Sequence, residues 1–232
     1  MSLEIITYKS PKSPIAESYR TLRTNLQFTS AGKELKTILI TSSMPGEGKS
    51  WTSSNLAVAF AQSGKKVLLI DADMRKGRQH KIFGLKKDNG LSNYLSGVGS
   101  HLLEMNSNLS DEDLLISMFN KTEVQNLFVM TSGNVPPNPS ELLQSERMLN
   151  MTNQLKEVFD IVIFDGPPCN VVTDGLILSR IVDSVAIVSS YKETKTEQLK
   201  NTVKGLQNVN AKIAGIILNK VPGRNSSYYA YK

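Results

Sequence analysis

Short apolar runs recur along the chain, and each is rich in Val and Ile and bounded by Gly, Pro, Asp or Asn. Runs of this kind predict buried strands. They lie at 37–41, 67–70, 127–130, 161–164, 184–188 and 213–218. Segments before or between them carry apolar residues at helical spacing and predict helices. These segments cover 15–28, 49–62, 140–158, 173–181 and 195–206.

The alternation of strands and helices predicts an α/β fold, with a mostly parallel β-sheet flanked by helices on both faces. In such folds ligands bind at the carboxyl ends of the strands. Residues 75–117 fit this rhythm poorly, and we expect short helices and loops there, outside the sheet.

The composition is that of a water-soluble globular protein, with 232 residues, 40% of them hydrophobic and 21% charged. The net charge of +6 fits an anionic ligand, an acidic partner or a membrane surface, and decides nothing alone. The single cysteine, Cys169, excludes an internal disulfide, and two histidines leave no zinc constellation. We expect no signal peptide and no membrane span, because no cationic leader and no apolar run of about 20 residues occurs.

The strongest motif follows the first predicted strand, where Ser43-Met44-Pro45-Gly46-Glu47-Gly48-Lys49-Ser50 precedes a predicted helix. It matches the phosphate-binding pattern G-x-x-x-x-G-K-[ST], except that Ser43 stands at the first glycine. A serine can take that place if its φ is negative. Backbone N–H groups of such a loop bind phosphates, Lys49 reaches the β and γ phosphates, and the Ser50 hydroxyl ligates Mg²⁺. We therefore expect ATP and Mg²⁺; the alternative is a turn with an incidental lysine.

Acidic residues follow two further predicted strands. Asp71 and Asp73 come after the run at 67–70, and Asp165 follows the run at 161–164. One acid after a strand is usually an ordinary turn residue. Three of them downstream of a phosphate loop predict a metal site formed with Ser50, in which one carboxylate also serves a substrate hydroxyl.

With these motifs in place, the chain resembles the bacterial tyrosine kinases called BY-kinases, the P-loop kinases of capsule and exopolysaccharide synthesis. The resemblance covers nearly the whole chain. It includes the Walker A segment 45–50, the Walker A′ segment 71–75, the Walker B segment ending at 165–168, and the run Pro-Pro-Asn-Pro-Ser-Glu-Leu-Leu at 136–143. It implies a P-loop NTPase-type fold in three parts: an N-terminal oligomerisation segment (1–36), a kinase domain (37–221) and a tyrosine-rich tail (222–232).

The resemblance also implies roles for the site residues. Lys49, Asp71, Asp73, Asp165 and Arg75 are expected to be catalytic: Lys49 counters the charge of the β and γ phosphates, Asp71 accepts or orients the tyrosine proton, and Arg75 neutralises charge on the transferred group. Nucleotide contacts are expected from Gly46, Glu47, Gly48, Lys49, Ser50, Trp51, Thr52 and Asn219, the last at the adenine.

Two segments outside the loop match the family as well. Glu17, Arg20, Arg23 and Asn25 fit its E-x-x-R-x-x-R-x-N oligomerisation motif, which implies a ring of subunits; Arg20 and Arg23 share one helix face. A solvated charged helix is the alternative. Tyr228, Tyr229 and Tyr231 lie in the last five residues, where the family carries its autophosphorylation substrates. Accidental tyrosines in a polar tail are the alternative.

A basic run is the last feature of note. Between 75 and 87 there are six cations and no acid before Asp88. They are Arg75, Lys76, Arg78, Lys81, Lys86 and Lys87. The run can attract an acidic partner segment or phosphate, or can be a plain solvated surface.

The family implies partners: a transmembrane polysaccharide co-polymerase that completes the ATP site, further copies of the chain, and a tyrosine phosphatase, but no nucleic acid. It implies a cytoplasmic protein recruited to the membrane by that co-polymerase. A switching ATPase of the MinD/ParA kind is the alternative, although Met44 stands where those proteins carry a signature lysine. A polysaccharide-assembly scaffold is a third. Cysteine phosphatase chemistry is rejected, because Gly175 occupies the place of the required arginine.

Overall fold

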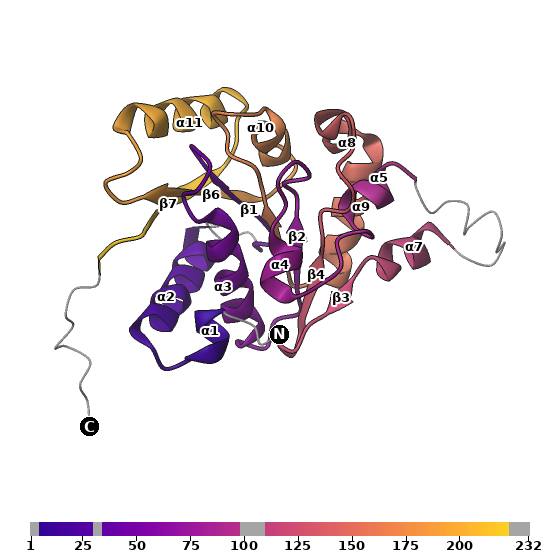
Figure 1. The fold of residues 1–232 in the computed structure, drawn as a ribbon, viewed down its shortest axis with the longest axis horizontal. Coiled ribbons are helices and arrows are strands. Elements are labelled where there is room, and N and C mark those ends of the chain that lie inside the picture. Colours follow the sequence, from indigo (N-terminus) through magenta and orange to yellow (C-terminus); the bar gives the residue numbers. More distant parts are fainter. Residues whose placement is uncertain (1–4, 30–33, 98–109, 223–232) are drawn as a thin grey trace.

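A computed structural model describes residues 5–29, 34–97 and 110–222. It holds one seven-stranded sheet in the order β3-β4-β2-β5-β1-β6-β7, in which β3 is antiparallel to β4 and every other pair is parallel (Figure 1). The strands are β1 (Thr37–Ser42), β2 (Val67–Asp71), β3 (Asn120–Lys121), β4 (Leu127–Met130), β5 (Ile161–Asp165), β6 (Ser184–Ser190) and β7 (Ile213–Asn219). The predicted α/β fold is thereby confirmed.

All six predicted strands form, but one of them is not buried as we predicted. β7 lies at the edge of the sheet, and Ile216 and Leu218 are 51% and 54% exposed. An edge strand has a neighbour on one side only, so its side chains lack half of the packing that inner strands receive. The short strand β3 was not predicted, since its two residues, one exposed and one half-buried, carry no apolar pattern.

All five predicted helical segments form, one of them in two parts, and the short helix α1 was not predicted. The helices are α1 (Ile6–Lys9), α2 (Pro14–Thr29), α3 (Lys49–Ala61), α4 (Gln79–Phe83), α5 (Leu91–Leu95), α7 (Asp111–Ser117), α8 (Pro139–Gln144), α9 (Glu146–Val158), α10 (Asp174–Ser179) and α11 (Thr196–Asn208). The predicted helix at 140–158 is divided because Ser145 adopts an extended backbone and its hydroxyl accepts the N–H of Met148, which starts α9. The short α4, α5 and α7 lie in the expected excursion from the sheet.

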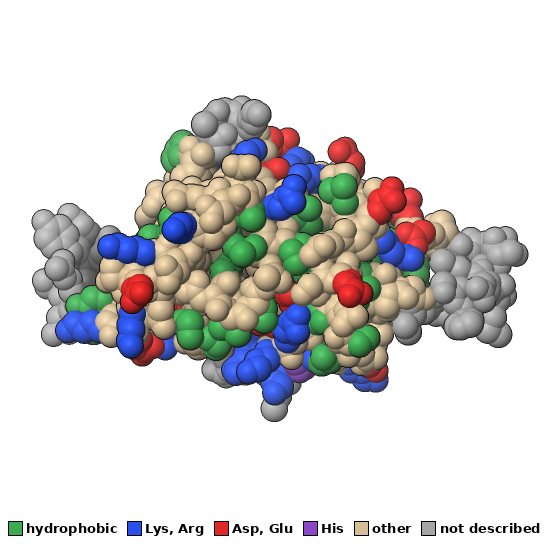
Figure 2. Space-filling view, turned by 90° about the horizontal axis from the view of Figure 1, so that it is seen from above, with side chains coloured by type: hydrophobic (Ala, Val, Ile, Leu, Met, Phe, Trp, Pro, Cys, Tyr) green, Lys and Arg blue, Asp and Glu red, His purple; other side chains and the backbone are tan. Residues whose placement is uncertain are grey.

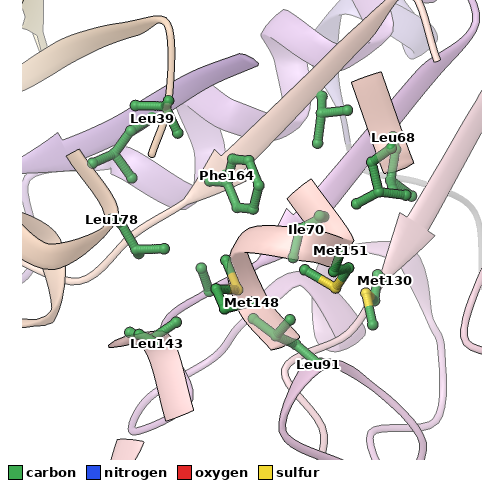
Figure 3. Close-up of a cluster of buried hydrophobic side chains, with 14 of the residues drawn as sticks. Leu39, Leu68, Ile70, Leu91, Met130, Leu143, Met148, Met151, Phe164 and Leu178 are labelled. Atoms are coloured by element: carbon green, nitrogen blue, oxygen red, sulfur yellow. The ribbon is translucent and has the colours of Figure 1, made fainter. Parts of the chain in front are cut away.

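Different helices cover the two faces of the sheet, and alternate residues of each strand face them. Ile38 and Ile40 of β1 belong to the cluster that includes α2 and α3. Leu39 between them joins α9, α10 and α11 on the other face. Figure 3 shows this second cluster, in which Leu39 and Phe164 from the sheet lie near Leu178 and the methionines of α9. Burial on both faces explains why the inner strands are continuous apolar runs.

Candidate active site

Three inner strands bring the predicted motifs together. β2, β5 and β1 are direct neighbours, and Asp71 at the end of β2 pairs in register with Asp165 at the end of β5. β1 runs into the glycine-rich loop, which leads to α3. The loop and both acidic segments therefore meet at the carboxyl ends of these strands, because neighbouring parallel strands end on the same side of the sheet.

The glycine-rich loop has the backbone that phosphate binding requires. Gly46 and Gly48 have φ values of 85° and 92°, a region that side chains other than glycine rarely adopt. A Cβ on Gly48 would stand 2.0 Å from Nδ2 of Asn219, so the loop also needs glycine there for space. Ser43 is not among the described residues with positive φ, as its place in the motif requires.

Glu47 braces the loop from within. Its carboxylate is buried, accepts the N–H of Met44 at 2.9 Å, and also accepts the hydroxyl of Thr194. Asn219 donates its amide to the carbonyl of Glu47 at 2.9 Å. Glu47 and Asn219, both predicted to contact the nucleotide, therefore join the loop to Thr194, which follows β6, and to the end of β7. Because the Glu47 side chain is engaged by Met44 and Thr194, a contact of Glu47 with phosphate would be made by its backbone.

Asp71 and Asp165 form the acidic centre of the site. Both are fully buried, and burial raises the pKa of each; the neighbouring Asp165 raises the pKa of Asp71 further. Oδ1 of Asp71 is buried without a hydrogen-bond partner among the described residues. Two adjacent buried carboxylates with an unused oxygen fit a hard divalent cation, with the Ser50 hydroxyl beside them as a hydrogen-bond partner of Asp165.

Carboxylates alone do not complete a metal site here. Within the described ranges no group of three or more His, Cys, Asp or Glu side chains is arranged to hold a metal ion. The remaining ligands would come from phosphate oxygens and water, which is the usual manner in which Mg²⁺ is bound at nucleotide sites. The predicted set of Ser50, Asp71, Asp73 and Asp165 is thus brought into one place, and its role as a metal site stays a prediction.

Gln79 links these groups, and sequence reasoning missed it. Its backbone N–H donates to Oδ2 of Asp71 at 2.9 Å, and its side-chain amide donates to Oδ2 of Asp165 at 2.8 Å and to the Ser50 carbonyl at 3.1 Å. Its carbonyl oxygen accepts the Ser54 hydroxyl at 2.8 Å. The side chain is fully buried. A single glutamine between charged residues carries no sequence signal, because only the fold turns it under the loop.

Two predicted catalytic cations are held by acids. Nζ of Lys49 lies 3.4 Å from Oδ2 of Asp73, so these two predicted residues face each other. Arg75 instead binds Asp174 through Nε at 2.8 Å and Nη2 at 3.2 Å. Ser140, in the Pro-rich run of the sequence, donates to the same carboxylate at 2.6 Å. Arg75 is thus engaged by a buried acid at the start of α10.

A cavity of about 420 Å³ opens beside the loop. Its lining comes from the loop, the segment after β2, α4 and the segment after β5: Pro45, Gly46, Gly48, Lys49, Ser50, Trp51, Asp73, Arg75, Lys76, Arg78, Lys81, Ile82, Pro167, Pro168, Val171 and Val172. Trp51 is 37% exposed and lines this cavity, and its contact with the nucleotide stays a prediction. Figure 2 looks onto this side of the molecule and shows Lys and Arg side chains gathered in the lower middle of the view.

Thr52 and Cys169 lie away from the cavity lining. Thr52 is buried in α3 and hydrogen-bonds to Tyr19 of α2, a contact that couples the two helices and leaves a phosphate contact by its hydroxyl a prediction. Cys169 is buried against Thr41, and burial raises the pKa of its thiol to about 11. A thiol with this pKa is an unreactive packing residue, which agrees with the rejection of phosphatase chemistry.

The predicted oligomerisation residues separate on α2. Arg20 pairs with Glu17 at 2.5 Å, and both are accessible, as is Asn25. Arg23 instead turns inward and donates to the carbonyl of Ala59 in α3 at 2.8 Å. The predicted shared face of Arg20 and Arg23 is therefore divided between solvent and the body of the protein. The tail tyrosines Tyr228, Tyr229 and Tyr231 lie outside the described residues.

No helix in the described part of the chain has both the length and the apolar character needed to cross a membrane.

Comparisons with known proteins agree with this geometry. A family model described as an AAA domain matches residues 35–217. The chain is 40% identical over 231 residues to the tyrosine-protein kinase YwqD of Bacillus subtilis (strain 168), which covers 100% of this chain and 92% of that protein. The chimerical protein CapA2B2 has a similar structure, with a TM-score of 0.83 and 37% identity over 94% of this chain and 90% of the other. The kinase domain of Escherichia coli tyrosine kinase ETK is also similar, with a TM-score of 0.84 and 32% identity. The match covers 98% of this chain and 84% of the other.

The chain is similar to switching ATPases of the MinD kind in fold only. MinD of Pyrococcus horikoshii, complexed with Mg-ADP, has a TM-score of 0.62 and 20% identity over 79% of this chain and 69% of the other. Fold alone does not fix function. The predicted P-loop architecture is confirmed, and similarity along nearly the whole chain is to tyrosine-protein kinases.

Proposed function

The chain belongs to the bacterial tyrosine-protein kinases built on a P-loop domain, and we propose that it phosphorylates its own carboxyl-terminal tyrosines, Tyr228, Tyr229 and Tyr231. The observation that carries the proposal is the meeting of the phosphate loop with buried Asp71 and Asp165 beside an open cavity. A loop for the donor, a buried base and room for an acceptor are what phosphoryl transfer to a hydroxyl needs.

The proposed transfer uses the groups already placed. The phenolic oxygen forms a bond to the γ-phosphorus, the bond from that phosphorus to the β–γ bridging oxygen breaks, and ADP leaves. The phenolic proton passes to Asp71, whose raised pKa, caused by burial and Asp165, makes it a stronger base once ionised. Lys49 balances charge on the β and γ phosphates, in place of its pairing with Asp73. Asp73 is then free to orient the incoming hydroxyl.

Mg²⁺ would be held through Ser50 and Asp165 and, when bound, would screen the negative charge of the phosphates, which leaves Asp71 to act as the base. The protein supplies the orientation of these ligands. Gln79 donates three hydrogen bonds, one each to Asp71, Asp165 and the Ser50 carbonyl. These bonds keep the two carboxylates from turning away from each other despite their repulsion.

We propose that the reaction occurs between subunits of a ring, in which the exposed Glu17 and Asn25 and the half-buried Arg20 contact the neighbouring copy. In this arrangement a transmembrane polysaccharide co-polymerase acts as activator, holds the cytoplasmic kinase at the membrane and completes its ATP site, and a tyrosine phosphatase reverses the reaction. The regulated process is capsule or exopolysaccharide synthesis. Support comes from the resemblance of the sequence to such kinases and from the accessibility of these α2 side chains to solvent.

The test is incubation of the intact chain with γ-labelled ATP and Mg²⁺, with and without the cytoplasmic segment of a candidate activator, followed by mass spectrometry of the tyrosines. We expect label on the tail of the wild-type chain and none on Lys49→Met, which keeps the fold and loses the cation at the phosphates. A chain that hydrolyses ATP steadily with its activator bound, and carries no phosphotyrosine, would favour the switching ATPase.

A further inference from the structure

We propose that the cavity beside the phosphate loop prefers acceptor tyrosines that stand next to a negative charge, so that one phosphotyrosine in the tail promotes phosphorylation of the next. The inference rests on the proposed function, because it takes the tail as the acceptor. It adds an acceptor preference and hence an order to the reaction. The preference is attributed to three cations that line the cavity, Lys76, Arg78 and Lys81.

These three cations, which we call the basic wall, have no acidic side-chain partner within the described residues, although Asp73 of the same cavity accepts the backbone N–H of Lys76. All three are exposed, and none forms an ion pair or hydrogen bond through its side chain within the described residues. The other cations of the cavity are paired: Lys49 with Asp73 and Arg75 with Asp174. Unpaired cations at the mouth of a cavity concentrate positive potential there and attract anionic groups.

The same cavity offers apolar surface for an aromatic ring. Pro168, Val171 and Val172 line it from the segment after β5, and Ile82 lines it from α4 beside Lys81. A tyrosine ring packs on such surface while its hydroxyl stays hydrogen-bonded. An acceptor segment lying here would have its ring against the apolar lining and its neighbouring residues along the basic wall.

The sequence of the tail makes the charge of the wall decisive. Residues 224–232 contain Arg224 and Lys232 and no acid, so the unmodified acceptor meets the basic wall with repulsion. One phosphate adds about −1.5 to −2 charges and three strong acceptor oxygens. A tail with a single phosphotyrosine is therefore near neutral overall and carries a dianion that Lys76, Arg78 and Lys81 can bind. The first transfer is the slow one, and each later transfer repeats the same chemistry on a better-bound acceptor.

Synthetic peptides of residues 224–232 separate this preference from the number of tyrosines. One peptide carries phosphotyrosine at Tyr229, and its matched control carries Tyr229→Phe, so both offer Tyr228 and Tyr231 as acceptors. With the intact kinase and its activator segment, we expect kcat/KM for the phosphorylated peptide to exceed that of the control by about tenfold, mainly through KM. Added salt should reduce this ratio, because the wall is exposed.

The basic wall is tested by a triple variant, Lys76→Gln with Arg78→Gln and Lys81→Gln. Its control removes the same charge from exposed cations of α11 and the following loop, Lys200→Gln with Lys204→Gln and Lys212→Gln. We expect the ratio between the two peptides to fall toward one in the first variant and to persist in the second. If the first variant does not fold, the salt dependence of the wild-type ratio decides.

Each remaining outcome overturns the inference in a distinct way. Equal kcat/KM for the two peptides in the wild-type kinase refutes the preference and leaves the proposed function standing. A basic-wall variant that keeps the peptide ratio and raises KM for ATP alone means that the wall serves the nucleotide instead. If neither peptide nor the unmodified tail is labelled while ATP is consumed, the proposed function itself fails.

Discussion

At the scale of single residues, the pair of Asp71 and Asp165 gives the site its reactivity and is unfavourable for the stability of the nucleotide-free fold. Burial and mutual repulsion raise the pKa of Asp71. We predict that Asp71→Asn abolishes transfer while keeping nucleotide binding. We also expect it to raise Tm of the nucleotide-free protein at neutral pH by about 2–4 °C, the shift that 1 kcal/mol gives in a chain of this size. Phosphate incorporation and thermal unfolding with and without ATP measure both effects.

The pH dependence of this stabilisation has a definite sign. Because the folded pKa of Asp71 lies above its unfolded value, the folded state binds more protons, and this residue makes stability fall as pH rises from the ordinary carboxyl pKa through the raised one. The advantage of Asp71→Asn should therefore be largest at neutral pH and vanish in acid. A variant that gains no stability at neutral pH would mean that the pair is not repulsive. Wild-type turnover in Asp71→Asn would pass the role of base to Asp73 or Asp165.

Gln79 is the residue through which the fold positions that pair. We predict that Gln79→Leu lowers kcat about tenfold or more with little change in nucleotide affinity, since Asp165 loses a donor and Ser54 an acceptor. Steady-state kinetics and nucleotide titration separate the two effects. Gln207→Leu, at an exposed position of α11, is the matched control. Loss of nucleotide affinity equal to the loss of kcat would instead make Gln79 a support of the phosphate loop.

At the scale of elements, α2 has two separate tasks that its charged motif does not distinguish. Arg23 fastens α2 to the carbonyl of Ala59 near the end of α3, whereas Arg20 stays with Glu17 at the surface. We predict that Arg23→Ala destabilises the subunit by about 1–2 kcal/mol, because a partly buried charged hydrogen bond is lost. Arg20→Ala should instead disperse the proposed ring with little change in Tm. Light scattering and thermal unfolding of both variants check this division, and the opposite pattern would contradict it.

The position of an element in the fold explains whether the sequence could predict it. Inner strands such as β1 and β5 are buried on both faces and therefore appear as apolar runs. The exposure of β7 depends on its place at the sheet edge, which no local pattern records. Likewise the phosphate loop has a spacing that can be recognised, whereas Gln79, the Glu47 brace and the Arg75–Asp174 pair are made by contacts between segments distant in sequence. The residues of the phosphate loop could be predicted from their spacing, whereas the residues that hold the loop and the acids in place could not.

At the scale of the whole molecule, the proposed cycle couples phosphorylation to assembly. We predict that the variant Tyr228→Phe with Tyr229→Phe and Tyr231→Phe removes most incorporated phosphate, leaves ATP binding intact and keeps the oligomer together in the presence of ATP and activator. The physical reason is that several phosphates on neighbouring tails, each with about −1.5 to −2 charges, repel one another and loosen the ring.

Light scattering after incubation with ATP measures this effect, alongside mass spectrometry of the incorporated phosphate. The control is Tyr191→Phe, outside the tail, which should behave like the wild-type chain. Oligomers of the wild type and of the triple variant that dissociate equally under ATP would separate assembly from tail phosphorylation.

The contact of Asn219 with the phosphate loop also sets a maximum length for the reaction. Asn219 is bound to Glu47 of its own catalytic site, and Tyr228 follows it nine residues later. A fully extended chain spans about 3.3–3.6 Å per residue, so Tyr228 lies within roughly 30 Å of its own phosphate loop. A neighbour can receive this tyrosine only if its catalytic centre is within that radius. The tether therefore acts as a ruler, and any assembly that spaces its centres more widely must leave Tyr228 unmodified.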